Sequence, residues 1–301
     1  MYLSSIIVAL TTAVLSSAAC VRRQEPQTPL LTIEGAWFEG ISVRENGTLV
    51  VNRLDVPELW TINPLTKESN KVLSIPNVLG LTGITEIEHD VFAFVAGNFS
   101  TADFTVEAGT WSVWKVDLSA EEPEAELIAD VPDAGFLLGT ATFDRDAILV
   151  ADAAQGKVLK IAVSTGKYTV IIEDGLLTPA ADADIPEAIH GIRYHGEEIY
   201  YTNTFGNSFG RFPIDASTAE VGNITTVANL TSPLDLAVDG DGNAYIGQIG
   251  EGIVKVSRNG TVTPAWNVTS ATSLAFGRTK EDSDILYAGT AVGELYALKI
   301  E

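Results

Sequence analysis

Apolar residues in this chain fall into short runs of strand length, and the runs recur in pairs along the sequence. The first run of each pair ends on a small or polar residue, and these runs are residues 49–52, 92–98, 148–152, 199–203, 244–248 and 286–290. The second run follows soon after, at residues 58–62, 112–116, 157–161, 210–214, 252–256 and 294–298. A period of roughly 40 to 55 residues is typical of propeller blades of four strands. The repeat therefore predicts an all-β fold, a six-bladed β-propeller.

Turn residues support the two further strands that each blade needs. In the fifth repeat, residues 234–238 lead through the turn 239–243 into the first run, and Asn259-Gly260 leads from the second run into residues 261–265. Asp-Gly and Asn-Gly pairs supply the positive φ angles of tight hairpins. No stretch after the N-terminal segment sustains a 3.6-residue apolar period, so no long helix is expected. The second repeat carries an insertion at residues 100–109.

A propeller must close its ring, and the last repeat supplies only about three strands of its blade. The apolar stretch at residues 29–33 precedes the first repeat. We expect it to form the outer strand of the last blade, so that an N-terminal strand closes the ring. A free N-terminal tail is the alternative.

The N-terminal 19 residues have the pattern of a signal peptide. Residues 6–15 are apolar, and Ser17-Ala18-Ala19 suits cleavage after Ala19. The apolar run is short for a membrane span, although a retained N-terminal anchor is the alternative. We expect a signal peptide at 1–19, a short segment at 20–28 and one propeller domain at 29–301. The mature protein would lie outside the cell or in the secretory-pathway lumen, with no membrane contact after cleavage.

Secretion fits the glycosylation motifs of the chain, and the cysteine count bears on how the fold is held together. Six Asn-x-Ser/Thr sequons predict a eukaryotic glycoprotein, with acceptors at Asn46, Asn98, Asn223, Asn229, Asn259 and Asn267. Cys20 is the only cysteine, so the fold has no internal disulfide.

The chain is strongly acidic. Its formal net charge is −22, from 40 acidic and 18 basic residues. Such a surface repels phosphate backbones, so nucleic acid is not an expected partner. The charge could attract cations, or it could simply keep a secreted protein soluble. We expect a monomer whose partner is a small-molecule substrate.

The innermost strands of a propeller line a central channel, and this places polar residues at one mouth. The starts of the six inner strands contribute Glu39, Thr82, Thr140, His190, Asp235 and Ser273. The ends of the next strands add Asn52, Arg53, Asp152, Asn203, Gln248 and Thr290. This mixture suits a polar small molecule. The alternative is that these groups satisfy one another and channel waters.

His190 stands out among the three histidines because Gly191 follows it and permits close backbone approach. His89 and His195 fall at expected turns and are expected to be solvated. Two other motifs are set aside. Residues 206–210 match G-x-S-x-G but join two strands, whereas a nucleophile elbow needs a following helix. Residues 239–243 resemble the start of a calcium loop, but position twelve would be Gly250 rather than Glu.

Three segments carry a resemblance to a known family: Glu39-Gly40-Ile41, His190-Gly191-Ile192 and residues 236–247. Together they resemble the SMP-30/gluconolactonase-like six-bladed propellers, over nearly the whole mature chain. That resemblance implies a metal-dependent lactonase or hydrolase, with calcium or zinc held by a Glu, two Asn and an Asp. Glu39 matches the Glu, but His190 replaces an Asn and Leu234 stands at the Asp position unless Asp235 substitutes. If a metal is present, its ligands would be Glu39, His190 and Asp235.

The departures fit a divergent branch better, since the chain also resembles the fungal hetero-Diels–Alderases of secondary metabolism. These enzymes join a quinone-methide-like tropolone to a terpene alkene, which implies a cyclase or pericyclase with no metal and no cofactor. On this interpretation the polarising groups are His190, Glu39, Arg53 and Asn203. The expected substrate contacts are Asn52, Asp152, Asp235 and Gln248, and the candidate apolar walls are Trp37, Phe38, Phe136 and Phe205.

Three interpretations therefore stay open. The first is a secreted metal-free cyclase of secondary-metabolite biosynthesis, the second a metal-dependent lactonase, and the third a non-catalytic binding propeller. Site chemistry has to decide between them, because one fold hosts many functions.

Overall fold

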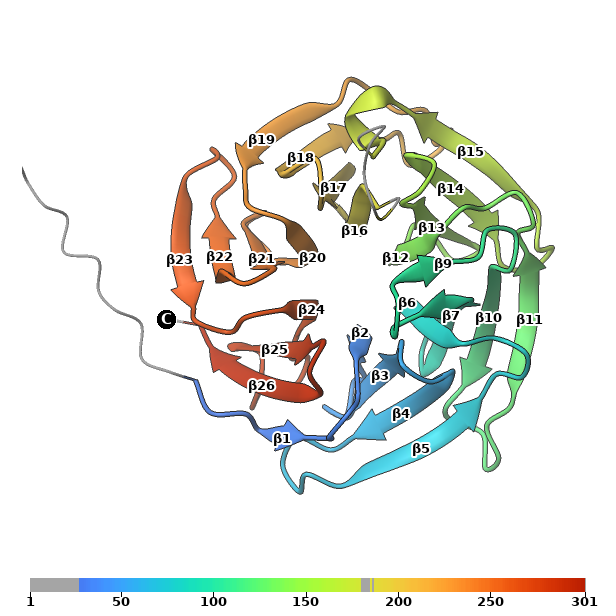
Figure 1. The fold of residues 1–301 in the computed structure, drawn as a ribbon, viewed down its shortest axis with the longest axis vertical. Helices are drawn as coiled ribbons and strands as arrows, with labels where there is room; N and C mark the ends of the chain where they lie inside the picture. The colour runs from blue at the N-terminus through green and yellow to red at the C-terminus, as the bar shows by residue number, and fades with distance from the viewer. Residues whose placement is uncertain (1–26, 180–184, 186, 301) are drawn as a thin grey trace, which may run out of the picture.

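Six four-stranded antiparallel sheets form a ring around a central axis (Figure 1). The structure is a computed structural model, and it describes residues 27–179, 185 and 187–300. The expected signal peptide and Cys20 lie outside the described residues. The ring confirms the six-bladed β-propeller predicted from the repeat.

Each blade is built outward from the axis in chain order. Blades one to three contain β2 (Phe38–Val43), β3 (Leu49–Arg53), β4 (Glu58–Ile62) and β5 (Ser69–Ser74); β6 (Gly80–Glu88), β7 (Val91–Gly97), β10 (Ser112–Asp117) and β11 (Ala125–Asp130); and β12 (Leu137–Thr142), β13 (Ala147–Asp152), β14 (Lys157–Ala162) and β15 (Tyr168–Glu173).

Blades four to six follow the same plan. They contain β16 (Ile189–His195), β17 (Glu198–Asn203), β18 (Ser208–Pro213) and β19 (Thr225–Asn229); β20 (Pro233–Val238), β21 (Ala244–Gln248), β22 (Gly252–Val256) and β23 (Val262–Trp266); and β24 (Ala271–Phe276), β25 (Ile285–Thr290), β26 (Glu294–Lys299) and β1 (Leu31–Thr32).

The N-terminal strand closes the ring, as expected from residues 29–33. Leu31 and Thr32 of β1 pair with Leu295 and Glu294 of β26. The N–H of Leu30 adds a hydrogen bond of 2.7 Å to the carbonyl of Leu295. Blade six is therefore assembled from both ends of the described chain, which is how a ring of repeats avoids an open seam.

The insertion in blade two forms a small hairpin of its own, β8 (Phe99–Ser100) and β9 (Thr105–Val106). In the described part of the chain the only helix is one 3₁₀ turn, η1 (Gly175–Leu177), in agreement with the expectation of no long helix. None of the described helical residues forms a span long and apolar enough to cross a membrane.

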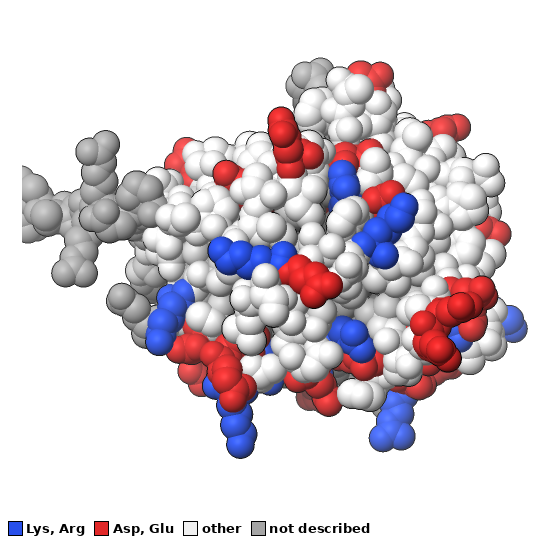
Figure 2. All heavy atoms as spheres, turned by 90° about the horizontal axis from the view of Figure 1, so that it is seen from below, with Lys and Arg blue, Asp and Glu red and all other residues white. Residues whose placement is uncertain are grey.

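Charged side chains are spread over the outside of the ring. Figure 2 shows acidic and basic groups interspersed on one side, with uncharged surface between them. Several pair across strands, for example Lys115 with Glu126 at 2.9 Å. Exposed pairs of this kind contribute little to stability, so the fold depends on its core.

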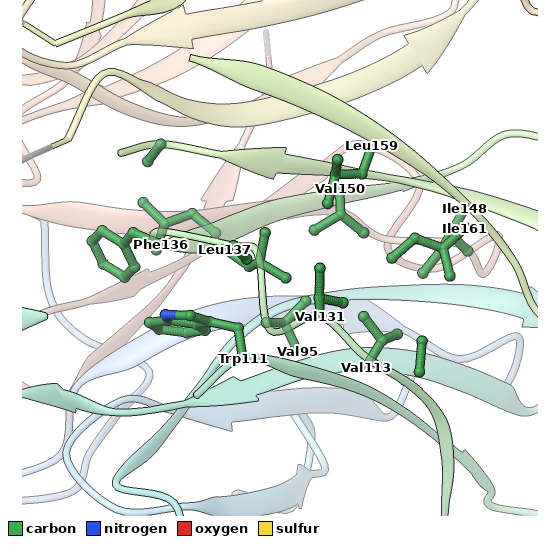
Figure 3. Packing of buried hydrophobic residues seen from close by; sticks show 14 of the residues in the cluster. Val95, Trp111, Val113, Val131, Phe136, Leu137, Ile148, Val150, Leu159 and Ile161 are labelled. Carbon is green, nitrogen blue, oxygen red and sulfur yellow. The ribbon is translucent and has the colours of Figure 1, made fainter. Parts of the chain in front are cut away.

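The core lies between neighbouring blades. Figure 3 shows Val95 and Val113 of blade two facing Ile148, Val150 and Ile161 of blade three. All five side chains are fully buried. Burying each such side chain stabilises the fold by about 1.5–3 kcal/mol, so these contacts hold the blades together without any disulfide.

Two aromatic residues expected to wall the channel belong to this core instead. Phe38 is 0% exposed and packs between blades six and one. Phe136 is 2% exposed and stacks on Phe99, with ring centroids 5.3 Å apart. That expectation was wrong, because an aromatic side chain buries more apolar area between blades than at the edge of a channel.

Each inner strand has a register shift near its start. The irregularities against the second strand lie at Phe38/Gly40, Leu81/Ile84, Leu137/Thr140, Ile189/Ile192, Pro233/Leu236 and Ala271/Ser273. Bulges of this kind re-aim side chains and are frequent beside functional sites. Here they fall at the residues that point toward the axis.

Glycines let the inner strands come close around the axis. A Cβ on Gly40, Gly83 or Gly139 would lie 2.3 Å from a carbonyl oxygen of the next blade's inner strand. A Cβ on Gly191 would lie 2.7 Å from Oδ1 of Asp235. We name the end of the channel where the inner strands begin the upper mouth, and the end where they finish the lower mouth.

Candidate functional site

Two ionisable side chains meet across the channel near the upper mouth. Glu39 comes from β2 of blade one and His190 from β16 of blade four, which lie on opposite sides of the ring (Figure 1). His190 Nε2 lies 3.2 Å from Glu39 Oε1, and their side chains are only 6% and 4% exposed. The other carboxylate oxygen, Oε2, accepts a hydrogen bond of 2.7 Å from Trp37 Nε1.

A second carboxylate approaches the same imidazole. Glu187 Oε1 lies 3.8 Å from His190 Nε2 and has no hydrogen-bond partner among the described residues. His190 Nδ1 and Thr140 Oγ1 are likewise buried without a partner in the described part of the chain. Buried polar atoms are normally satisfied, so this group of orphaned atoms points to a bound water or ligand.

The carboxylates change the acidity of the imidazole. Burial alone would lower the pKa of His190, but the hydrogen bond to Glu39 and the negative charges of Glu187, Glu39 and Asp235 together raise this pKa to about 9. Burial raises the pKa of Glu39, although His190 and Trp37 oppose that effect. The imidazole of His190 is therefore protonated on both nitrogens at neutral pH. Because Nε2–H faces Glu39, the free donor is Nδ1–H.

Asp235 of β20 is held beside this pair by an arginine. Arg193 Nη2 lies 2.7 Å from Asp235 Oδ2, and the N–H of Leu274 donates to the same oxygen at 3.0 Å. Arg193 Nη2 also donates to the carbonyl of Leu274 at 3.1 Å. The arginine thus ties the inner strands of blades four, five and six together.

The channel is divided into two cavities. The upper one, of about 10 Å³, is lined by Glu39, Thr140, His190, Arg193 and Asp235 among others. Such a volume holds about one water molecule. A larger cavity of about 350 Å³ opens at the lower mouth and takes residues from all six inner strands. Arg193 and Thr140 line both cavities, so these two residues lie between the upper and the lower cavity.

Four of the predicted substrate contacts and polarising groups form hydrogen bonds with backbone groups instead. Asn52 Nδ2 donates to the carbonyl of Thr82 at 2.7 Å, and Gln248 Nε2 to that of Thr231 at 3.0 Å. Asp152 accepts from the N–H groups of Gly135, Phe136 and Gln155, and Asn203 bonds Leu176 and Gly206. Asp152, Asn203 and Gln248 thus fix upper-mouth loops, as the alternative interpretation of satisfied polar groups predicted. Asn52 instead holds the inner strand β6, and its buried Oδ1 has no partner among the described residues.

Most of the other predicted residues also contact groups of the protein itself. Arg53 bonds Asp55, lies 3.8 Å from Glu58 and packs on the ring of Trp60, so its guanidinium is engaged within blade one. Thr82, Ser273 and Thr290 donate to carbonyl oxygens. Trp37 contacts Glu39, and Phe205 is 37% exposed at the upper mouth.

The loops of the upper mouth are unusually apolar. Six of the ten exposed large apolar side chains among the described residues lie there: Leu79, Phe104, Leu176, Phe205, Ile249 and Val292. Trp37 packs edge-on against Phe104, with ring centroids 6.2 Å apart. In the described sequence of these loops there is no Lys or Arg. The mouth therefore combines an apolar and acidic rim with a buried proton donor.

The sequence interpretation missed Glu187 and Arg193. Each lies three positions from His190 along the chain, and the bulge between Ile189 and Ile192 alters which way the side chains of β16 point. Proximity to His190 was therefore the only available signal, because alternation along a regular strand does not apply across a bulge.

The remaining histidines and sequons are placed as follows. The side chain of His89 is 67% exposed, whereas His195 lines the lower cavity. Five of the six sequon asparagines are exposed, namely Asn46, Asn223, Asn229, Asn259 and Asn267. Asn98 is half-buried, and its Nδ2 donates to Glu107 at 2.8 Å.

The metal ligands implied by the resemblance lie near one another but are not arranged as a metal site. No three His, Cys, Asp or Glu side chains of the described residues are arranged so that they could hold a metal ion. Glu39, His190 and Asp235 do line one small cavity, but their charged atoms contact one another and Arg193.

Comparison with known sequences supports the resemblance to the hetero-Diels–Alderases, at modest identity. No family model matches the chain. A protein of a Phoma species, provisionally named a hetero-Diels–Alderase, is 27% identical over 84% of this chain and 83% of its own. A second protein with that provisional name, from Sarocladium schorii, is 26% identical over 84% of this chain and 75% of its own.

Among solved structures, the calcium-binding protein regucalcin from Agrobacterium tumefaciens has the same fold. It superimposes with a TM-score of 0.69 at 17% identity, over 92% of this chain and 95% of its own. At this identity the likeness shows the fold alone.

Proposed function

We propose that this protein is a secreted cyclase that catalyses a hetero-Diels–Alder-type cycloaddition at the upper mouth, without a metal ion. The relatives of similar length that carry this provisional name support the reaction class. The observation that carries the proposal is the buried His190, whose pKa is raised to about 9 and whose Nδ1 has no partner among the described residues.

The reaction needs two things from the protein: correct placement of the two reactants and one hydrogen-bond donor. A heterodiene such as an α,β-unsaturated ketone and an alkene combine so that one C–C and one C–O bond form as π bonds are used up. No atom leaves, and no net proton or electron is exchanged. A donor on the carbonyl oxygen withdraws electron density from the heterodiene, and a desolvated donor is stronger than one in water. The Nδ1–H of His190 supplies that donor.

Placement of the two reactants contributes the larger share of such an acceleration. Holding them face to face replaces a bimolecular encounter and contributes roughly 7–11 kcal/mol to the barrier reduction in the best cases. The exposed Phe104 and Phe205 and the half-buried Trp37 offer apolar surfaces for this purpose. The upper cavity has room for about one water. We infer that the carbonyl oxygen replaces that water while the reactants' apolar bodies stay at the mouth loops.

A product assay in the presence of a chelator separates this proposal from a lactonase or a binding protein. Purified protein, treated with EDTA, is incubated with an enone-type heterodiene and an electron-rich alkene. We expect a product whose mass is the sum of the two reactants, formed faster than in the protein-free control. Loss of this activity on chelation together with calcium-dependent lactone hydrolysis would support the lactonase instead. Tight substrate binding with no rate enhancement would support a binding protein.

A further inference from the structure

Each of the two carboxylates of the candidate site already contacts a nitrogen-bearing side chain of the protein. Glu39 is matched by His190 at 3.2 Å, and Asp235 is matched by Arg193 at 2.7 Å. Glu39 stands at a ligand position of the calcium or zinc site implied by the family resemblance, and Asp235 can stand at a second. The charge-bearing atoms of all four side chains belong to residues that line the same small cavity.

We propose that the side chains of His190 and Arg193 take the place of the divalent ion implied by the resemblance, and that they close the site to metal. The contacts of the two carboxylates are the first argument. A divalent ion would have to bind Glu39 and Asp235 together, but His190 Nε2 already lies 3.2 Å from Glu39 and Arg193 Nη2 lies 2.7 Å from Asp235. Glu187 Oε1 lies 3.8 Å from the same His190 nitrogen.

The donor atoms are the second argument. Calcium takes about six to eight oxygen ligands, so a site needs free carboxylate oxygens. In this site Oε1 of Glu39 faces His190, and Oε2 accepts from Trp37 at 2.7 Å. Oδ2 of Asp235 accepts from both Arg193 and the N–H of Leu274. Three of these four oxygens therefore already have a partner in the protein, and a metal ion would have to displace the side chains of His190 and Arg193 to reach them.

The position of Arg193 is the third argument. It follows His190 by three residues on β16, and the bulge in that strand lets both residues line the upper cavity. The side chain of Arg193 is 24% exposed and also lines the lower cavity. It therefore fills the channel at the level where an ion held by Glu39 and Asp235 would lie.

This inference concerns the site of the proposed function but does not depend on the reaction. Its test measures metal binding by the folded protein, so its failure and the failure of the cyclase proposal can be told apart. Arg193 acts as a positioning residue, since it contacts Asp235 rather than a reactant.

The test is isothermal titration of calcium, and separately of zinc, into the purified full-length protein. The variants are His190→Asn, Arg193→Gln, the double variant, and the double variant with Glu39→Gln. Wild type and both single variants should show no saturable site that depends on Glu39. The double variant should bind one ion saturably in the millimolar range or more tightly, and Glu39→Gln should abolish that site. Circular dichroism and thermal melting show which variants are folded.

Two results would overturn the inference. One is a stoichiometric calcium or zinc site on the wild-type protein that Glu39→Gln removes. The other is a folded double variant that binds no ion in the millimolar range. If Arg193→Gln prevents folding, His190→Asn with Arg193→Met replaces it with another unbranched side chain and answers the same question. The titration of the wild-type protein tests the inference even if none of the variants folds.

Discussion

His190 Nε2 lies 3.2 Å from Glu39 Oε1 across the axis of the propeller, although their strands belong to blades one and four. This contact closes the channel below the upper mouth. It also orients the imidazole, since one nitrogen faces a carboxylate and the other is left without a protein partner among the described residues. This contact leaves Nδ1 as the free nitrogen of the proposed donor, and its hydrogen bond is the largest of the effects that raise the pKa of His190.

Glu39→Gln should change the pH range of activity. Among the effects that raise the pKa of His190, the hydrogen bond to Glu39 is the largest, so its loss should bring this pKa down from about 9. A neutral imidazole carries only one N–H and is a weaker donor. We expect the variant to lose activity between pH 6 and pH 8 by about tenfold or more relative to wild type. A pH–rate profile measures this, and identical profiles for the two proteins would contradict it.

Stability should fall as the pH rises from 6.5 to about 9. The folded protein holds a proton on His190 up to about pH 9, whereas an ordinary histidine with a pKa of 6.5 releases it earlier. The stabilisation from this proton is complete below pH 6.5 and lost through pH 9. The raised pKa of Glu39 has the same sign, because its carboxylate form is disfavoured by burial.

Urea unfolding at a series of pH values measures that dependence. We expect the free energy of unfolding to decrease by at most about 3 kcal/mol across this window. In His190→Gln the decrease should largely disappear, since the variant has no proton to lose at this position. An equally steep decrease in the variant would assign the effect to other groups.

Gly139→Ala tests the close approach of the inner strands. Its new Cβ would lie 2.3 Å from the carbonyl oxygen of His190, on the neighbouring blade. We expect destabilisation by about 1–3 kcal/mol, as for overpacking in a dense core. Gly240→Ala is the matched control, because its Cβ would meet nothing within 4 Å and it has no positive φ. Thermal melting of both variants measures the difference in stability. Equal melting temperatures for Gly139→Ala and Gly240→Ala would contradict the account.

Sequon occupancy should differ between Asn98 and the others. Nδ2 of Asn98 is hydrogen-bonded to Glu107 on a half-buried side chain, whereas the other five asparagines are exposed. When the full chain is expressed in a eukaryotic secretory host, we expect glycans on exposed sequons and none on Asn98. Glycopeptide mass spectrometry measures this. A fully occupied Asn98 would contradict the accessibility argument.

Much of the fold could be predicted because each sequence repeat shows how long its strands are and which polar residue ends them. Residues 29–33 could be assigned to the last blade because a ring with an incomplete blade needs one more strand. The polar strand ends were harder to interpret. Asn52 and Asn203 have the chemistry of ligand-binding residues, but both donate to unpaired backbone carbonyls, Asn52 at the bulge of β6 and Asn203 in an upper-mouth loop.

The site itself was predictable only in part. His190 and Glu39 were predicted because each stands at the start of an inner strand; Gly191 singled out His190 among the histidines, and the family resemblance pointed to Glu39. Glu187 and Arg193 were not found, because a bulge changes the direction of side chains in β16 and leaves no mark in the apolar pattern. Phe38 and Phe136 were misplaced for a different reason: a sequence does not distinguish an aromatic residue between blades from one at a channel wall.

The most direct measurement compares the cycloaddition rates of His190→Phe and His195→Phe with that of wild type. His195 lies on the same strand and lines the lower cavity, so it is a matched control for the loss of an imidazole. Removing one preorganised donor typically costs about 10²–10³ in rate. The account predicts a loss of about this size for His190→Phe, with His195→Phe within about twofold of wild type. Full activity in folded His190→Phe, or equal losses in both variants, would contradict it.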